Sequence, residues 1–209
     1  MENNRIVQGI EERGKGKYWI IFDDGLKFVL YKGEVRRFGF AVGEAVSADI
    51  IDYILSELLL KRGKDRALYL LQSMSRTKKQ IQDKLLADEY PPELIEQILE
   101  FLERYHYLDD ESYVRNYIES RMKTKSLRQI KAELIQKGVD SRDIEAGMEE
   151  FESEQLEEEE MQLMLRLLKK KHKDIPNATR EEKQKLYAFL ARKGFSGEKI
   201  QTAIRRAEQ

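Results

Sequence analysis

An internal repeat with helical spacing constrains this chain more than any other feature of its sequence. Apolar or aromatic residues recur at the same five spacings in three copies: Ile81, Leu85, Tyr90, Ile95 and Leu99; Ile130, Leu134, Val139, Ile144 and Met148; and Leu186, Leu190, Phe195, Ile200 and Ile204. The second and third copies also share a Lys-Gly pair, Lys137-Gly138 and Lys193-Gly194. Because glycine tolerates the left-handed conformation that ends many helices, each pair predicts a turn between two helices. The chain therefore reads as a tandem helical repeat protein.

Each copy follows another segment with helical apolar spacing, at 67–74, 113–118 and 161–168. This predicts three helices per repeat, and each repeat would use its neighbour to bury apolar faces. The expected repeats cover 65–108, 109–153 and 154–209. In the third repeat, Thr179 and Glu182 have the spacing of a capping box at the start of a helix.

The first 46 residues have a different pattern, with short β-branched and aromatic runs separated by glycine-containing turns. The runs are Ile6-Val7, 18–22 and 28–31, and Asp24-Gly25 between the last two favours a tight hairpin. We predict a small antiparallel β meander over 1–46. A connecting helix and linker over 47–64 would follow, with the helix ended by Lys61-Arg62-Gly63-Lys64. The expected fold class is mainly α: an elongated array of three three-helix repeats, preceded by this meander and helix.

Residue types and motifs argue against catalysis by the chain itself. There is no cysteine, no phosphate-binding glycine loop, and no metal-ligand spacing between His106 and His172. We expect His106 to be packed or partly exposed, and His172 to belong to a solvated basic segment. Asp109-Asp110-Glu111 could bind a hard cation, but acids at a helix start are more simply explained by capping and the helix dipole. We therefore expect no catalytic residue, no metal and no cofactor.

Composition also predicts the compartment. The absence of cysteine fits a reducing environment. No run approaches the roughly 20 apolar residues of a membrane helix, and residues 1–10 lack a signal-peptide core. We expect a soluble cytoplasmic monomer that does not contact a membrane.

Charge is nearly balanced over the chain, with a net charge of −1, but it is locally segregated. Residues 112–142 carry eight basic residues against three acidic ones, whereas 149–160 carry eight glutamates and no base. On the expected helix after Ser126, Arg128 and Lys131 lie opposite the apolar residues. This pattern suits a basic binding stripe, and it equally suits an ordinary solvated helix face.

Several motifs together resemble the RecX family of bacterial recombinase regulators. They are the three-helix repeats, the Leu-Asp-Asp-x-x-Tyr segment from Leu108 to Tyr113, and the segment 130–139 with its Lys-Gly turn. The resemblance covers about residues 67–204. Its departures are Val114, where the family commonly has alanine, and a loop over 123–126 without the family's glycine. The motif residues carried over are Asp109, Asp110, Tyr113, Gly138 and Gly194.

The resemblance implies a regulator that is not an enzyme. It would bind the RecA recombinase filament on DNA, in the helical groove, and restrain ATP hydrolysis and strand exchange in recombination, repair and the SOS response. DNA, single- or double-stranded, is a further expected partner. The expected partner-binding residues are Arg121, Lys123, Lys125, Arg128, Lys131, Arg115, Lys169, Lys170 and Lys171.

Two other functions remain open. A general DNA-binding or repressor module would place the third helix of a repeat in the major groove. The helices expected over 93–103 and 141–152 are acid-rich and would be repelled by phosphates. The third copy, with Lys199, Arg205 and Arg206, is not excluded. A helical scaffold in another assembly is the remaining alternative, because repeats alone do not name a partner.

Overall fold

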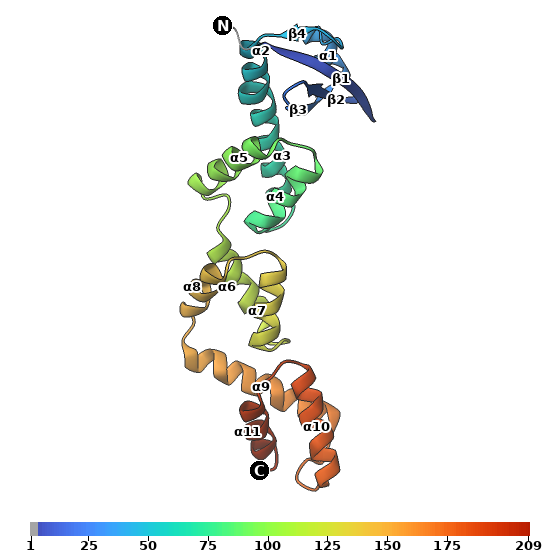
Figure 1. Cartoon of the computed structure of the whole chain (residues 1–209). Coiled ribbons are helices and arrows are strands. Elements are labelled where there is room, and N and C mark those ends of the chain that lie inside the picture. The colour runs from blue at the N-terminus through green and yellow to red at the C-terminus, as the bar shows by residue number, and fades with distance from the viewer. Residues whose placement is uncertain (1–3) are drawn as a thin grey trace. The chain divides into compact units, whose positions relative to one another are not determined.

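A computed structural model describes residues 4–209, which divide into two compact units (Figure 1). The first unit ends at Leu108 and contains β1 (Arg5–Gly14), β2 (Lys17–Phe22), β3 (Lys27–Tyr31), α1 (Lys32–Phe38), β4 (Ala45–Val46), α2 (Ala48–Tyr53), η1 (Ile54–Leu59), α3 (Leu60–Ser73), α4 (Lys78–Ala87) and α5 (Pro92–Arg104). The second unit, Asp109–Gln209, contains α6 (Asp110–Arg121), α7 (Leu127–Gln136), α8 (Ser141–Glu149), α9 (Ser153–Lys171), α10 (Arg180–Arg192) and α11 (Gly197–Ala207). No helix within 4–209 is long and apolar enough to cross a membrane.

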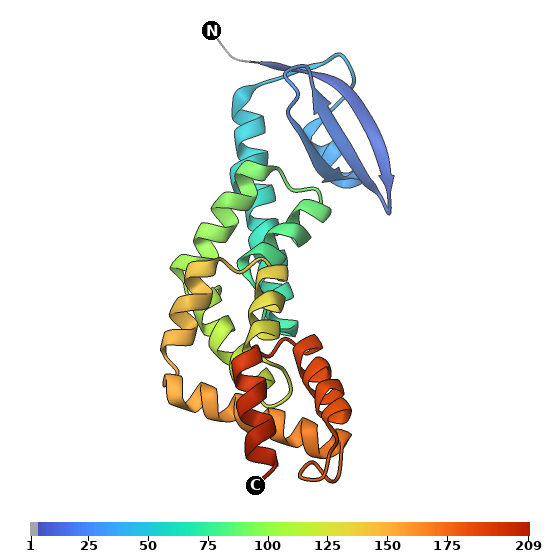
Figure 2. The same ribbon diagram turned by 60° about the horizontal axis from the view of Figure 1, so that its bottom comes forward.

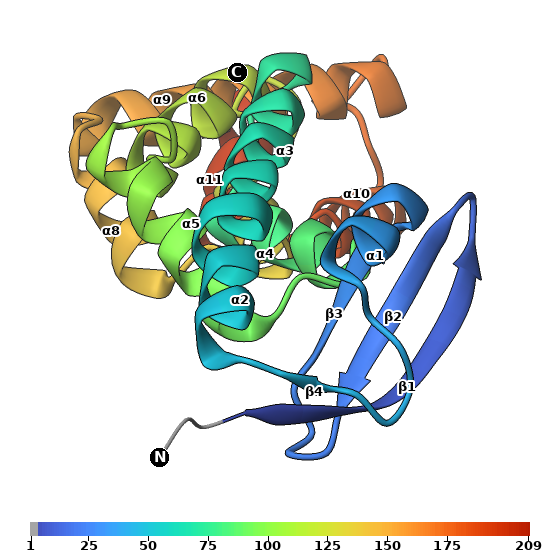
Figure 3. The same cartoon turned by 90° about the horizontal axis from the view of Figure 1, so that it is seen from above.

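The predicted antiparallel meander is confirmed, with two additions. The strand order is β3-β2-β1-β4, and all pairings are antiparallel. The short strand β4 extends the sheet by pairing with the start of β1. The sequence pattern did not indicate α1, which lies against β2 and β3 (Figure 3). One face of the sheet supplies fully buried side chains to a core shared with the following helix: Ile20, Phe22, Phe28 and Leu30 from the sheet, and Ile51 and Ile54 from the helix.

The predicted end of the connecting helix at Lys61–Lys64 is wrong. The helix continues without a break from Ala48 to Ser73, and its middle turn, η1, is π-helical. Gly63 is buried inside it, where an added Cβ would collide with Cδ1 of Ile98 on α5. Glycine is present there because two helices approach closely, so its helix-breaking tendency does not decide the local structure.

The prediction of three three-helix repeats is confirmed. The repeats consist of α3–α5, α6–α8 and α9–α11, and in the third α9 packs against α11 (Figure 2). Twelve of the fifteen repeat positions identified in the sequence are buried, and Tyr90, Met148 and Ile204 are half-buried. Each repeat has its own apolar cluster, so the helical period correctly identified the buried faces.

Caps and turns fix the boundaries of these helices. Asp109 accepts a hydrogen bond from the Ser112 backbone N–H at 2.9 Å, which caps α6. Thr179 and Glu182 form the predicted capping box of α10. The two Lys-Gly turns place glycine in the left-handed region, with φ of 78° at Gly138 and 85° at Gly194. An L-residue in that region costs about 1–2 kcal/mol, so the turn favours glycine.

We expect Gly138→Ala to lower the free energy of unfolding by about 1 kcal/mol, because alanine is strained at this φ. Urea unfolding of the full chain measures the change. Gly33→Ala is the matched control, since Gly33 lies in α1 without a positive φ and an added Cβ there meets nothing within 4 Å. Equal stability of the two variants would show that the Gly138 turn imposes no strain.

Candidate partner-binding surface

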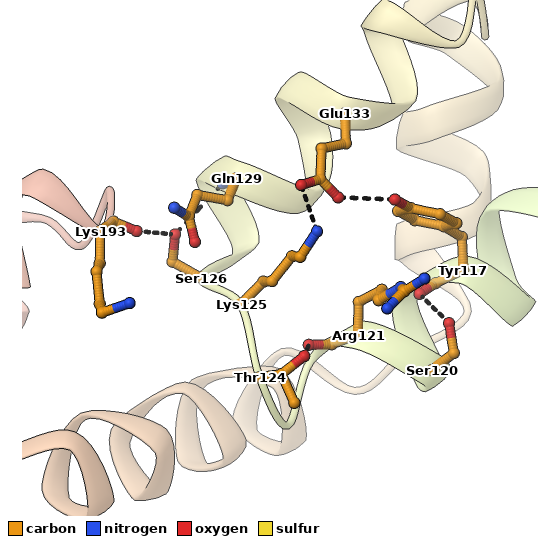
Figure 4. Close-up of polar contacts among 9 residues, drawn as sticks. All are labelled: Tyr117, Ser120, Arg121, Thr124, Lys125, Ser126, Gln129, Glu133 and Lys193. Carbon is orange, nitrogen blue, oxygen red and sulfur yellow. Dashed lines mark hydrogen bonds and ion pairs between the residues drawn. The ribbon is translucent and has the colours of Figure 1, made fainter. Parts of the chain in front are cut away.

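Five of the basic residues predicted in repeat two lie on or next to the α6–α7 loop, and Figure 4 shows two of them, Arg121 and Lys125. We call Arg121, Lys123, Lys125, Arg128 and Lys131 the basic cluster. Arg121 ends α6, and Ser126 caps α7 by accepting a hydrogen bond from the Gln129 N–H. Four members of the cluster are exposed, whereas Lys125 is half-buried. The cap therefore fixes where the first turn of α7 presents its cations.

Lys125 differs from the rest of the cluster because it is used inside the repeat. Its ammonium pairs with Glu133, which also accepts a 2.7 Å hydrogen bond from the Tyr117 hydroxyl (Figure 4). The Lys125 bond, followed by the Tyr117 bond, lowers the pKa of the Glu133 carboxyl. Burial, reinforced by Glu133, raises the pKa of Tyr117 to about 12, so its hydroxyl keeps the proton that it donates. The charge of Glu133 is thus neutralised within repeat two.

The other four members of the basic cluster have no acidic partner within residues 4–209. Lys123, Arg128 and Lys131 form no ion pair there, and the Arg121 guanidinium lies 5.7 Å from the centre of the Tyr117 ring. The charge of an exposed cation without an acidic partner is not compensated within the protein, so it can attract an external anion.

We expect Glu133→Gln to reduce the loss of stability in acid. Because the folded-state pKa of Glu133 lies below its usual value of 4.5, its contribution is present above about pH 4.5 and is lost as pH falls through the folded value. Melting temperatures measured below and above this pH should therefore differ less in Glu133→Gln than in the wild type. If the two melting temperatures differ as much in the variant as in the wild type, Glu133 contributes no pH-dependent stability.

The other predicted contact residues lie in different surroundings. Arg115, on α6, is half-buried and bonds to Glu150 and to the Ser112 hydroxyl, so its charge is used within repeat two. Lys169, Lys170 and Lys171 form the exposed last turn of α9, where cations favourably meet the negative end of the helix dipole. The Lys171 ammonium lies 5.7 Å from the centre of the Phe189 ring.

The expectation that His172 is solvated is wrong. His172 ends α9 with a half-buried side chain, and its buried Nδ1 has no hydrogen-bond partner among the described residues. Its Nε2 lies 3.5 Å from the Glu182 carboxylate. His106 is exposed, with a φ of 56° in the turn after α5. Of the motif tyrosines, Tyr113 is half-buried and stacks with Tyr117 at a centroid distance of 6.0 Å.

The structure also shows a set of contacts between repeats two and three that the sequence did not indicate. We call this contact region the joint. At the joint, the Ser126 hydroxyl donates to the Lys193 carbonyl at 2.7 Å, and Arg166 donates to the Lys123 carbonyl at 3.1 Å. Glu160 of α9 is also part of the joint, although in the sequence it is one of the eight glutamates of 149–160. No local spacing signals such contacts, because the partners lie 33 to 67 residues apart.

A cavity of about 490 Å³ in the first unit is an alternative candidate site. Its wall includes Arg62 and Arg66, which pair with Glu34 and Asp88 respectively. Burial raises the pKa of Tyr90, also in the wall, to about 12. The two arginines of this cavity are paired internally, so the basic cluster is the better candidate for binding an anionic partner.

Comparison with protein families matches all three repeats to one family. Residues 64–102 match the family model described as RecX, first three-helix domain. Residues 109–148 match the second three-helix domain, and residues 157–204 match the third. The three matches together span more than half of the chain.

Individual proteins agree with this assignment. The chain is 29% identical to "Regulatory protein RecX" of Streptococcus sanguinis (strain SK36), over 94% of this chain and 75% of that protein. It also resembles a solved structure described as "Crystal structure of regulatory protein RecX", with 26% identity and a TM-score of 0.64, over 95% of this chain and 98% of the other. A RecX structure from Lactobacillus salivarius matches with 25% identity and a TM-score of 0.65, over 72% of this chain and 97% of the other.

Proposed function

Because the chain belongs to the RecX family of regulatory proteins, we propose that it binds the filament of the RecA recombinase on DNA and restrains its ATP hydrolysis and strand exchange. In this proposal it acts in the helical groove of the filament and takes part in recombination, repair and the SOS response in the cytoplasm. The protein itself catalyses nothing. Its effect comes from binding that changes what the recombinase can do.

The observation that carries this proposal is the basic cluster with its acid neutralised. Glu133 is occupied by Lys125 and Tyr117, while Arg128 and Lys131 extend from α7 without acidic partners in the described chain. A filament on DNA presents phosphates and acidic protein surface together, and exposed cations favour fast association with both.

The alternative of a general DNA-reading module is less well supported. It depended on the third copy, in which Lys199, Arg205 and Arg206 would enter the major groove. Two of these cations already have acidic partners: Lys199 bonds to Glu160, and Arg206 lies 3.6 Å from Glu158. A helix whose cations are compensated in this way is poorly suited to a phosphate-lined groove.

The proposal is tested by the ATPase rate of the host recombinase on single-stranded DNA with increasing amounts of this protein. We expect inhibition at well below one protein per recombinase subunit, because one bound regulator would restrain a stretch of filament. Protein alone should show no ATP turnover. Inhibition that begins only when the protein is in large excess, and that added DNA relieves, would instead indicate competition for DNA and contradict the proposal.

A further inference from the structure

The joint between repeats two and three holds the start of α7 from several directions. Glu160 accepts a 2.9 Å hydrogen bond from the Leu127 backbone N–H, in the first turn of α7, on one carboxylate oxygen. Its other oxygen accepts a 2.9 Å bond from the Lys199 ammonium of α11. The Ser126 hydroxyl meanwhile donates to the carbonyl of Lys193, in the turn after α10. Glu160 and Lys193 of repeat three thus bond directly to residues 126–127 of repeat two, and Lys199 is linked to that segment through Glu160.

Close packing brings the Gly194 turn of repeat three against the start of α7 in repeat two. A methyl group at Gly194 would lie 2.9 Å from Ser126 Oγ and 3.7 Å from Arg128 Cβ. Lys193 is therefore adjacent to Arg128, although they belong to different repeats. Lys193 and Lys171 in turn lie on Phe189, with ammonium-to-centroid distances of 5.5 and 5.7 Å. Arg128 of repeat two and Lys193 and Lys171 of repeat three therefore occupy neighbouring positions at the joint.

The buried acid of the joint, Glu160, does not compensate these cations, and the exposed Glu157 lies 3.8 Å from Lys199. The Glu160 side chain is only 7% exposed and is neutralised by Lys199. Within residues 4–209, no ion pair involves Arg128, Lys171 or Lys193. Burial of a carboxylate requires such pairing, so Glu160 serves the packing of the joint, with Lys199 as its partner.

The composition of this surface favours phosphates over protein. Protein interfaces centre on buried aromatic and apolar side chains, whereas contacts to a nucleic acid backbone come mainly from arginine and lysine. The exposed large apolar residues of the described second unit are Ile135, in the last turn of α7, and Tyr187, whose hydroxyl lies beside Gly197. The joint surface itself is formed by cations at the starts and ends of helices.

We propose that the joint is a composite site for the phosphate backbone of a nucleic acid strand, with Arg128 contributed by repeat two and Lys171 and Lys193 by repeat three. Glu160 is its positioning residue, because it holds the two repeats in the register that makes their cations adjacent. The inference rests on the proposed function for its setting, a filament that contains DNA, but it assigns the ligand of this surface.

The first test measures binding of the full chain to a fluorescent single-stranded oligothymidylate, without recombinase, at several salt concentrations. Arg128→Ala and Lys193→Ala should each weaken binding several-fold and reduce the slope of log affinity against log salt by about one. Full retention of affinity and slope in both variants overturns the composite site. Retained DNA binding with weakened filament binding also overturns it, in favour of an acidic protein ligand, and leaves the proposed function intact.

The second test separates positioning from simple electrostatics. Glu160 and Glu157 both lie on α9, and both approach the Lys199 ammonium, at 2.9 and 3.8 Å, but Glu157 has a 68% exposed side chain and does not bond to α7. Removal of either negative charge should strengthen binding of a polyanion if charge alone mattered. We expect Glu157→Ala to bind equally or slightly more tightly, and Glu160→Ala to bind several-fold more weakly.

Circular dichroism and thermal melting must show that Glu160→Ala keeps its helices. If it does, tighter binding by Glu160→Ala, equal to that of Glu157→Ala, overturns the positioning role. If Glu160→Ala does not fold, the variants of Arg128, which is exposed, and Lys193, which is half-buried, decide the proposal.

Discussion

Arg128→Glu combined with Lys131→Glu is expected to weaken binding to the recombinase filament by at least about tenfold, which corresponds to about 1.4 kcal/mol. Both side chains are exposed on α7 and neither has an acidic partner in the described chain. Their reversal replaces two attractions to phosphate or acidic protein by two repulsions. Helix content and melting temperature should stay close to wild type, because exposed charges contribute little to folding.

A matched control is needed because the double variant also changes the net charge of the whole chain. Lys61→Glu with Lys84→Glu makes the same change at exposed positions of the first unit and should bind almost normally. Loss of binding to bare DNA and filament alike would favour a general DNA-binding module, and loss on the filament alone would favour recognition of the recombinase. If Arg128→Glu with Lys131→Glu restrains the recombinase as well as wild type, the basic cluster is only a solvated helix face.

Gly147→Ala is expected to lower the free energy of unfolding by about 2 kcal/mol, although alanine is the better helix former. Gly147 lies in α8, where an added Cβ would be 2.7 Å from Cγ1 and 2.8 Å from Cβ of Val114 on α6. A β-branched side chain cannot rotate away from such a contact, so α6 and α8 must separate. Overpacking of this kind typically costs about 1–3 kcal/mol. Urea unfolding of the full chain measures the loss.

Repeat one provides the comparison, because its glycine at this helix contact, Gly63, lies on the first helix of the repeat. In repeat two the glycine, Gly147, lies on the third helix. Ile98, Gly147 and Ala203 occupy equivalent positions on the third helices of the three repeats, and Ile98 packs against Gly63 of the first helix. An alanine at Gly63 would meet mainly Cδ1 of Ile98, the flexible end of that side chain. Gly63→Ala should therefore cost less than Gly147→Ala, and Ile98→Val should relieve most of the cost. Equal losses at both glycines, with no relief, would contradict this explanation.

Much of the fold follows from the sequence because its determinants are local and periodic. The spacing of Ile130, Leu134 and Ile144 identifies helix faces that are buried in the structure. The hairpin at Asp24-Gly25 and the capping box of Thr179 are determined by residues a few positions apart. Signals of this kind are visible in a single sequence.

The errors arise where a distant contact decides the outcome. Gly63 reads as a helix end, but its packing against Ile98, 35 residues away, keeps it inside a helix. Lys125 reads as a free cation, but a turn brings it to Glu133. Glu160 reads as one glutamate of an acidic run, and only the assembly of two repeats shows that it is buried. Residue type and spacing did not contain this information, because it depends on which surfaces meet.

The unbroken helix from Ala48 to Ser73 also determines how the first unit unfolds. Its first half contributes Ile51 and Ile54 to the core of the sheet, and its second half contributes Ala67 and Leu70 to the core of repeat one. Leu60 packs against both clusters. Loss of the strands would expose the apolar side of a helix that the first repeat also needs. Sheet and repeat therefore form one cooperative folding unit, and a protein shortened to its three repeats would carry an unprotected hydrophobic stripe prone to self-association.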